Sequence, residues 1–127
     1  MRAMKLTLAV GAMTLAGSAA GYAQDAARGK ALTDQCLACH TLTAGEDPGP
    51  GPTLAGIAGA KAGTRPDFEY SDAFQAANAR GLVWTDAALN RFLANSQTDV
   101  PRNKMAFPGV ANERDRADIV AYLKTLK

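Results

Sequence analysis

Apolar residues recur at helical spacing in four short segments of the chain, as they do in amphipathic helices. The first segment runs from about Asp25 up to the first cysteine, and the second begins near Ser71 and ends at Gly81. The third starts after Thr85, and the fourth begins at Asn112. The apolar positions are Ala27, Ala31 and Leu32, then Ala73, Phe74 and Ala77, then Leu89, Phe92 and Leu93, and finally Ile119, Val120, Tyr122, Leu123 and Leu126.

Helix-capping residues support two of these starts. Thr85 is a good N-cap residue, and Asn112 with Asp115 resembles a capping box. Leu32 and the apolar residues at 119–122 should bring the first and last helices together. The pattern therefore predicts a small all-α domain.

Two segments between the predicted helices have the character of loops. Residues 42–65 are rich in Gly and Pro, and so long a loop is unusual in a small domain unless it wraps a bound group. The stretch DVPRNKMAFPG contains Met105 between Pro101 and Pro108, so it cannot form one continuous helix.

Residues 1–23 have the features of a secretory signal peptide. The segment opens with basic residues, Arg2 and Lys5, continues with an uncharged apolar stretch from Leu6 to Ala16, and ends in Gly-Tyr-Ala at residues 21–23. An uncleaved anchor is the alternative, but the apolar core is shorter than the ~20 residues that span a bilayer. We expect cleavage after Ala23, export to the periplasm and no integral membrane span afterwards.

Removal of this segment changes the charge balance of the protein. The whole chain of 127 residues has a formal net charge of +2, from 14 Lys and Arg against 12 Asp and Glu. The two basic residues of the signal segment have no acidic counterpart there, which leaves twelve of each sign in residues 24–127. A nucleic-acid or anionic-membrane binder would show a basic excess, so both classes are disfavoured. Residues 24–127 fit a single domain.

The sequence CLACH, residues 36–40, contains both cysteines and the only histidine of the chain. A Cys-x-x-Cys pair serves in thiol–disulfide exchange, in zinc sites and in covalent haem attachment, where the following His binds the iron. A zinc site lacks a second ligand pair here, and a thioredoxin-like centre lacks the strand that should precede it. Covalent haem needs only Cys36, Cys39 and His40, so the motif favours haem.

Met105 is the only methionine outside the signal segment and the best candidate for a second axial ligand of a haem iron. A second histidine does not exist, and a thioether is one of the standard haem ligands. The alternative is a methionine that fills the core. A loop stiffened by prolines is an unusual place for that role and loses little entropy when it is ordered around a ligand.

Together, CLACH, GPTLAG, FEYSDAF, LVW, VPRNKMAFPG and DIVAYLK resemble, in order and near spacing, the class I c-type cytochromes, most closely the cytochrome c2/mitochondrial-type subgroup. The similarity extends from about Arg28 to Lys127. It implies the small single-domain class I cytochrome c fold, with helices wrapped around one covalently attached haem c per chain.

The resemblance also implies roles for individual residues. Cys36 and Cys39 would carry the thioethers, and His40 and Met105 would be the axial iron ligands. The Pro52 carbonyl would accept the other imidazole N–H, which fixes the ring. Tyr70 and Trp84 match side chains that donate hydrogen bonds to a haem propionate, and Asn103 would also lie in the surroundings of the haem.

Three positions depart from the subgroup pattern. Ala60 replaces an arginine that often lies near the inner propionate, which removes a fixed positive charge. Phe92 replaces a tyrosine whose hydroxyl bonds the ligand methionine in many relatives, and Asn103 stands where a threonine is common. Many docking lysines are also missing, although Arg102 and Lys104 remain.

A haem with both axial positions filled by protein does not readily bind a substrate, which favours electron transfer over enzymatic chemistry. The sequence thus predicts a monomeric periplasmic electron carrier with redox proteins as partners. A peroxidase or gas sensor with Met105 as a labile ligand is the enzyme alternative, and a haem-free Cys-x-x-Cys or metal protein is the other.

Overall fold

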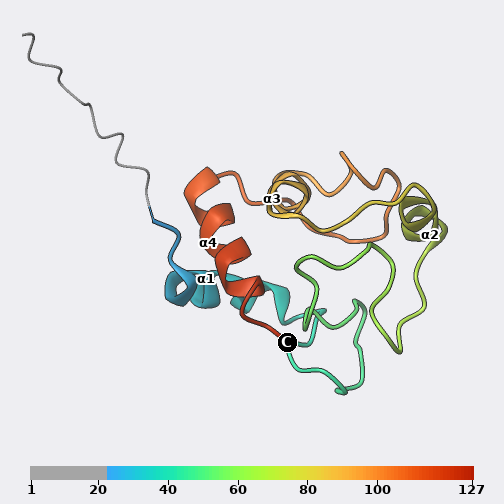
Figure 1. The fold of residues 1–127 in the computed structure, drawn as a ribbon, viewed down its shortest axis with the longest axis horizontal. Coiled ribbons are helices and arrows are strands. Elements are labelled where there is room, and N and C mark those ends of the chain that lie inside the picture. Colours follow the sequence, from blue (N-terminus) through green and yellow to red (C-terminus); the bar gives the residue numbers. More distant parts are fainter. Residues whose placement is uncertain (1–22) are drawn as a thin grey trace, which may run out of the picture.

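The computed structural model describes residues 23–127, so residues 1–22 of the predicted signal peptide lie outside the described part. It contains the helices α1 (Ala26–Thr33), α2 (Asp72–Ala79), α3 (Asp86–Ala94) and α4 (Glu113–Leu123), with a 3-10 turn, η1 (Asp34–Cys36), directly after α1 (Figure 1). The only β pairing in residues 23–127 is an isolated bridge between Lys61 and Val83. No helix in this part of the chain has the length and apolar character to cross a membrane.

The predicted helix starts agree with the structure because they depend on local capping. The Thr85 hydroxyl accepts from the Ala88 N–H at 3.1 Å, and the Asn112 amide oxygen accepts from the Asp115 N–H at 3.1 Å. Only half of the expected capping box forms, however. The Asp115 carboxylate forms an ion pair with Arg28 of α1, and this pair links α4 to α1.

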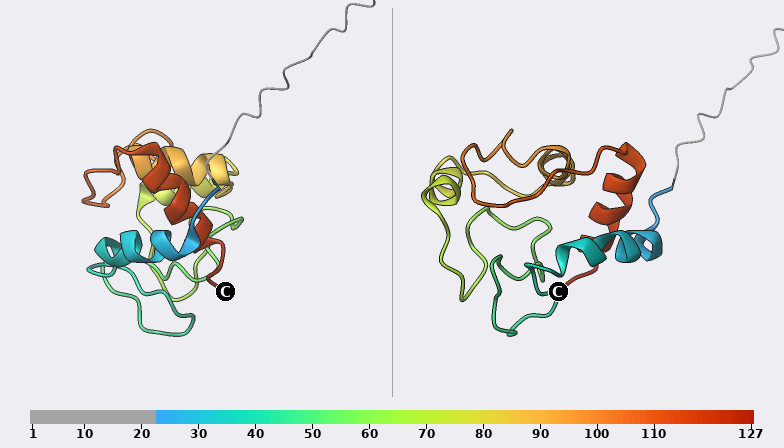
Figure 2. Two further views of the ribbon diagram at one scale, coloured as in Figure 1. Left: turned by 90° about the vertical axis from the view of Figure 1, so that its left-hand side faces the viewer. Right: turned by 180° about the vertical axis from the view of Figure 1, so that it is seen from behind.

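Helices α1 and α4 cross in direct contact (Figure 1, Figure 2), as predicted, but the contact point is Gly29. A Cβ at Gly29 would lie 1.9 Å from the Asp118 carbonyl oxygen and 3.0 Å from Tyr122 Cβ. Leu32, the residue expected at this crossing, is partly buried and packs against the core. The crossing therefore depends on the missing side chain of Gly29.

Charged groups close the edge of this crossing. The Asp118 carboxylate accepts from the Asp25 backbone N–H at 2.8 Å and from the Arg28 guanidinium at 2.6 Å. These donors, the Asp25 N–H first and Arg28 second, hold the pKa of Asp118 below its usual value.

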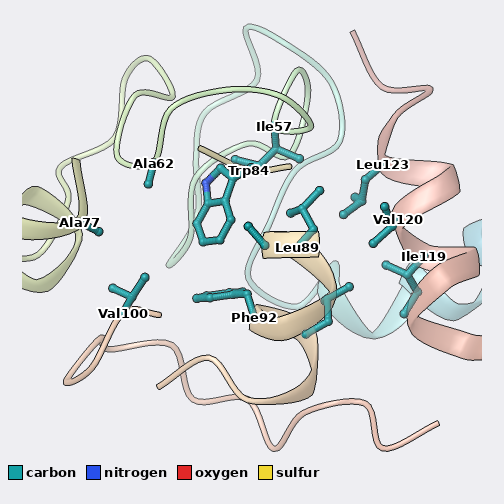
Figure 3. Packing of buried hydrophobic residues seen from close by; sticks show 12 residues of the cluster. Ile57, Ala62, Ala77, Trp84, Leu89, Phe92, Val100, Ile119, Val120 and Leu123 are labelled. Atoms are coloured by element: carbon teal, nitrogen blue, oxygen red, sulfur yellow. The ribbon is translucent and has the colours of Figure 1, made fainter. Parts of the chain in front are cut away.

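The hydrophobic core lies between α3, α4 and the segment before α3 (Figure 3). Trp84 and Phe92 lie side by side, with ring centroids 4.9 Å apart and an interplanar angle of 67°. Leu89 and Leu93 of α3 and Ile119, Val120 and Leu123 of α4 complete this part of the core. All of these side chains except Val120 line the internal cavity described below.

The long predicted loop is present between Leu37 and Ser71, and backbone hydrogen bonds fix its path. Gly59 N–H donates to the Trp84 carbonyl, and Trp84 N–H donates to the Ala60 carbonyl, both at 2.8 Å. Near the other end of the loop, Gly51 N–H donates to the Cys39 carbonyl at 2.8 Å. The loop is thus tied both to the segment before α3 and to the Cys-x-x-Cys-His turn.

Candidate cofactor site

A cavity of about 640 Å³ lies inside the fold, which is within the usual range of roughly 300–1,000 Å³ for ligand sites. Its wall includes Cys36, Cys39, His40 and Met105, so the structure brings together all four residues that the sequence proposed for iron and haem binding. Most of the remaining wall is apolar and comes from the core and from the loops on either side of it.

The turn after η1 places the cysteines and the histidine on this wall. Cys39 N–H and His40 N–H both donate to the Cys36 carbonyl, at 3.1 Å and 2.9 Å. His40 Nδ1 lies 2.7 Å from the Pro52 carbonyl oxygen, which can only accept, so Nδ1 carries the proton. The lone pair is therefore on Nε2, the nitrogen left free to bind a metal.

Gly51 allows the imidazole to lie against the loop, a role that the sequence alone did not predict. A Cβ at residue 51 would lie 2.5 Å from His40 Cε1, 2.7 Å from Nδ1 and 2.9 Å from Nε2. Every one of these distances is shorter than a carbon atom tolerates, so only glycine fits beside the ring. The glycine-proline repeat at residues 48–52 was visible in the sequence, but the ring that packs against it was not.

The Met105 loop is shaped by a neighbouring amide side chain. Asn103 Nδ2 donates to the carbonyls of Ser96 and Val100, both at 2.9 Å, and Asn103 Oδ1 accepts from the Met105 N–H at 2.8 Å. Asn103 is 8% exposed and is not among the residues that line the cavity. The structure therefore places Asn103 behind Met105, where it fixes the backbone of the loop and makes no contact with the cavity.

Hydroxyl and indole donors gather along another part of the wall, where Tyr70, Ser71 and Trp84 line the cavity. The Tyr70 hydroxyl oxygen accepts from the Arg65 backbone N–H at 3.1 Å, so its own proton remains available for an acceptor. Burial raises the pKa of Tyr70, which keeps this hydroxyl protonated. Ser71 Oγ is buried and has no hydrogen-bond partner among the described residues. Such a wall suits the carboxylate groups of a bound molecule.

Ser71 was predicted only as a helix start. It precedes α2 in the N-cap position, but its hydroxyl does not cap the helix. A serine at a helix start normally caps, so no signal in the sequence distinguished this hydroxyl from an ordinary cap.

The environment of the cysteines does not favour thiol–disulfide chemistry. Cys36 and Cys39 are not joined in a disulfide. Burial raises the pKa of the Cys36 thiol, whereas a reactive redox cysteine has a lowered pKa. Within residues 23–127 there is no cluster of three or more His, Cys, Asp or Glu side chains that could hold a metal ion.

Comparison with known proteins identifies the family. The family model described as Cytochrome c matches residues 26–127. The chain belongs to the cytochrome c family. Cytochrome c2 of Rhodomicrobium vannielii is 40% identical over 125 residues, which cover 98% of this chain and 97% of that protein.

Solved cytochrome structures also share the fold. The structure of cytochrome cH from Methylobacterium extorquens matches with a TM-score of 0.72 at 43% identity, over 80% of this chain and 98% of that one. Cytochrome c2 from Rhodospirillum centenum gives a TM-score of 0.75 at 32% identity, over 81% of this chain and 98% of that one. The prediction of a small all-α cytochrome c fold of the c2 subgroup is confirmed.

Membership in the family establishes the cofactor and the class of activity. The protein carries a covalently attached haem c and is an electron-transfer protein that works with redox partners, not an enzyme. The cavity fits such a group, because it combines an apolar interior, a histidine with a free Nε2, a thioether, and hydroxyl donors that have no acceptor among residues 23–127.

Proposed function

We propose that this cytochrome is a periplasmic one-electron carrier whose haem iron is bound by His40 and Met105, with thioether links at Cys36 and Cys39. The observation that carries the proposal is that a single cavity is lined both by a histidine whose Nδ1 is already bonded to the Pro52 carbonyl and by the only methionine of residues 24–127. In Figure 1 and Figure 2, the segment after α1 and the loop after α3 lie on different sides of the interior, as two axial ligands require.

The protein groups around the haem would orient the iron ligands and set the reduction potential. Bound haem c supplies a reversible one-electron change at its iron. The Pro52 carbonyl orients the His40 imidazole and increases its basicity, and Asn103 holds the Met105 backbone in place. A thioether together with an imidazole would stabilise the reduced state more than two nitrogen ligands would, so we expect a high reduction potential. With His40 and Met105 as its ligands, the iron would keep no position open to a substrate.

Two observations support export: the pattern of residues 1–23, and an alignment with a cytochrome c2 that includes most of this segment. Residues 1–23 have a basic start, an apolar core and a small-residue end, as signal peptides do. The match to the Rhodomicrobium vannielii cytochrome c2 spans 98% of the chain and therefore includes most of this segment. We propose that cleavage after Ala23 releases a monomeric protein into the periplasm, and N-terminal sequencing of the periplasmic holoprotein tests this site.

The ligand pair is tested with Met105→Ala in holoprotein matured with its haem. We expect the variant to lose the weak far-red charge-transfer band of sulfur ligation, to bind carbon monoxide in the ferrous form and to have a lower potential. Phe107→Ala is the matched control, because it removes a large side chain from the same loop and from the same cavity wall but leaves the thioether.

The control separates loss of a ligand from loosening of the loop. The proposal is supported if Met105→Ala binds carbon monoxide and neither Phe107→Ala nor the wild type does. Equally fast binding by wild type and Met105→Ala would show that Met105 is not the ligand and would favour the sensor or peroxidase alternative.

A further inference from the structure

The stretch between α3 and α4, which carries Met105, contains no helix, and its far end is held by one side chain of α4. In Figure 1 this stretch leaves α3 toward α2 and turns back to reach α4. Arg116 Nη1 donates to the carbonyls of Val110 and Ala111, both at 2.9 Å. Arg116 Nε donates to the Asn90 amide oxygen of α3 at 3.1 Å. One guanidinium therefore joins the end of the stretch to both of the helices that border it.

The position of Arg116 in α4 explains why its side chain reaches backward along the chain. Side chains of an α-helix lean toward its N-terminus. Arg116 belongs to the first part of α4, where its N–H donates to the Asn112 carbonyl at 3.1 Å, so the residues just before the helix are within reach. A guanidinium has five N–H donors in a fixed plane, enough for all three acceptors. No ion pair among residues 23–127 includes Arg116, so these donors are committed to neutral oxygens.

The same end of the stretch packs closely on α3. Val110 N–H donates to the Leu93 carbonyl at 2.8 Å. Gly109 has φ +92°, and a Cβ at this residue would lie 2.3 Å from the Ala94 carbonyl oxygen. The end of the stretch therefore lies against the C-terminal end of α3, and Arg116 closes it from the side of α4.

Charged side chains also hold the start of the stretch, but at the surface. Asp99 forms an ion pair at 3.0 Å with Arg91, whose side chain is 52% exposed, and the Asp99 carbonyl accepts from Arg80 at 2.9 Å. Exposed ion pairs contribute little to stability. Two of the three Arg116 bonds are partly buried, whereas both contacts of Asp99 are exposed. Among the charged side chains that bond to the stretch, Arg116 therefore makes the more sheltered contacts.

We propose that Arg116 is a positioning residue for the sixth iron ligand: it holds residues 109–111 on α3 and α4 and thereby keeps Met105 at the cavity wall. The inference rests on the proposed ligation of the iron by Met105. Arg116 does not line the cavity, so it acts only through the backbone of the stretch. A stretch that loses these bonds opens at lower free energy, and its thioether then leaves the iron more often.

The test measures how fast imidazole binds to the ferric holoprotein. An added ligand reaches the iron only after the methionine has left it, so the rate at saturating imidazole reports on that release. Arg116→Met should bind at least about tenfold faster than the wild type, a difference of about 1.4 kcal/mol in the free energy of opening. Arg116→Lys, which keeps the charge but not the planar set of donors, should lie between the two. Asn90→Ala should give a smaller increase, and none when it is added to Arg116→Met, because its partner is then absent.

Two control variants separate release of the ligand from a general loss of stability. Lys124→Met breaks the exposed ion pair with Asp86, another contact between α4 and α3 that does not touch the stretch, and should keep the wild-type rate. Arg28→Met breaks the ion pairs between α1 and α4, so it should lower the unfolding midpoint and leave the rate close to that of the wild type. If Arg28→Met accelerates binding as much as Arg116→Met does, the effect is one of overall stability and the proposal fails.

Met105→Ala distinguishes failure of this proposal from failure of the ligand pair. Fast binding by Met105→Ala, together with a wild-type rate for Arg116→Met, would refute the role of Arg116 and leave Met105 as the ligand. Equal rates for the wild type and Met105→Ala would show that Met105 is not the ligand, and both proposals would fall. If Arg116→Met does not form holoprotein, Arg116→Lys and Asn90→Ala decide by the same comparison: faster binding supports the proposal, and wild-type rates in both overturn it.

Discussion

Replacement of Gly51 by alanine tests how His40, the proposed iron ligand, is held. The added Cβ would lie 2.5 Å from His40 Cε1, and real Cβ atoms do not approach closer than 3.0 Å, so the ring must retreat by at least about 0.5 Å. A retreat of this size also stretches the 2.7 Å contact between His40 Nδ1 and the Pro52 carbonyl. The substitution therefore perturbs both the packing and the hydrogen bond of the imidazole.

The expected cost follows from these two losses. Overpacking costs about 1–3 kcal/mol, and the weakened hydrogen bond adds about 0.5–1.5 kcal/mol. With a denaturant slope of about 2–6 kcal/mol/M in guanidinium chloride, a total of roughly 2–4 kcal/mol lowers the unfolding midpoint by about 1 M. The assay is guanidinium unfolding of the ferric holoprotein, followed by the haem absorbance and the far-red band.

Gly49→Ala is the matched control in the same loop. Its Cβ would lie 3.2 Å from the Cys39 carbonyl oxygen, a tight contact that shifts of a few tenths of an ångström relieve, so the midpoint should fall much less. A Gly51→Ala protein with the wild-type midpoint and an unchanged far-red band would refute the packing of His40 against Gly51.

Three further predictions concern stability and docking. Gly29→Ala should lower the free energy of unfolding by at least about 1–3 kcal/mol in a guanidinium titration, because its Cβ would lie 1.9 Å from the Asp118 carbonyl oxygen. A variant as stable as the wild type would contradict the close contact of α1 and α4 at Gly29. The lowered pKa of Asp118 means that its stabilising effect is present above the unfolded-state pKa of about 3.9 and is lost as pH falls through the folded value. Asp118→Asn should therefore lose stability at pH 7 and show a weaker acid dependence between pH 7 and pH 3 than wild type, whereas Asp86→Asn on the surface should match wild type. Positions 24–127 contain twelve basic and twelve acidic residues and therefore give no strong field to steer a redox partner, so we propose that partners dock on the apolar residues 105–109 of the Met105 loop. Electron-transfer rates should then fall only modestly as added salt shortens the Debye length to ~10 Å, and Phe107→Glu should slow them. A steep salt dependence, or no effect of Phe107→Glu, would refute this docking surface.

The helices could be predicted from the sequence because their signals are local. Thr85 and Asn112 cap the helices that follow them through bonds to residues three positions ahead, so a short window contains all the information needed. Met105 was identified in a similar way, since no other methionine follows the signal segment and the prolines around it exclude a helix. Composition and local order therefore sufficed for the fold class and for the candidate ligands.

The remaining features depend on contacts between distant parts of the chain. Gly29 and Gly51 matter because a carbonyl of α4 and an imidazole lie against them, and neither neighbour is visible in a local window. Asn103 occupies a position that the family resemblance assigned to the haem surroundings, but its amide bonds to Ser96, Val100 and Met105. These bonds join residues up to seven positions apart, and the role of Asn103 in the surroundings of the haem stays a prediction that it would exert through the Met105 backbone.

The two proposed axial ligands are held by different means, and this difference predicts which one is released first. His40 is fixed by the Pro52 carbonyl, by the absence of a side chain at Gly51 and by the thioether links proposed for Cys36 and Cys39 on the same turn. Met105 lies in the stretch between α3 and α4 that contains no helix, and within residues 95–111 the buried side chains are those of Ser96, Val100 and Asn103. Segments with few buried contacts open at lower free energy than the rest of a protein. Mild denaturant should therefore remove the sulfur ligand, and with it the far-red band, before the His40 ligation and the helical core are lost.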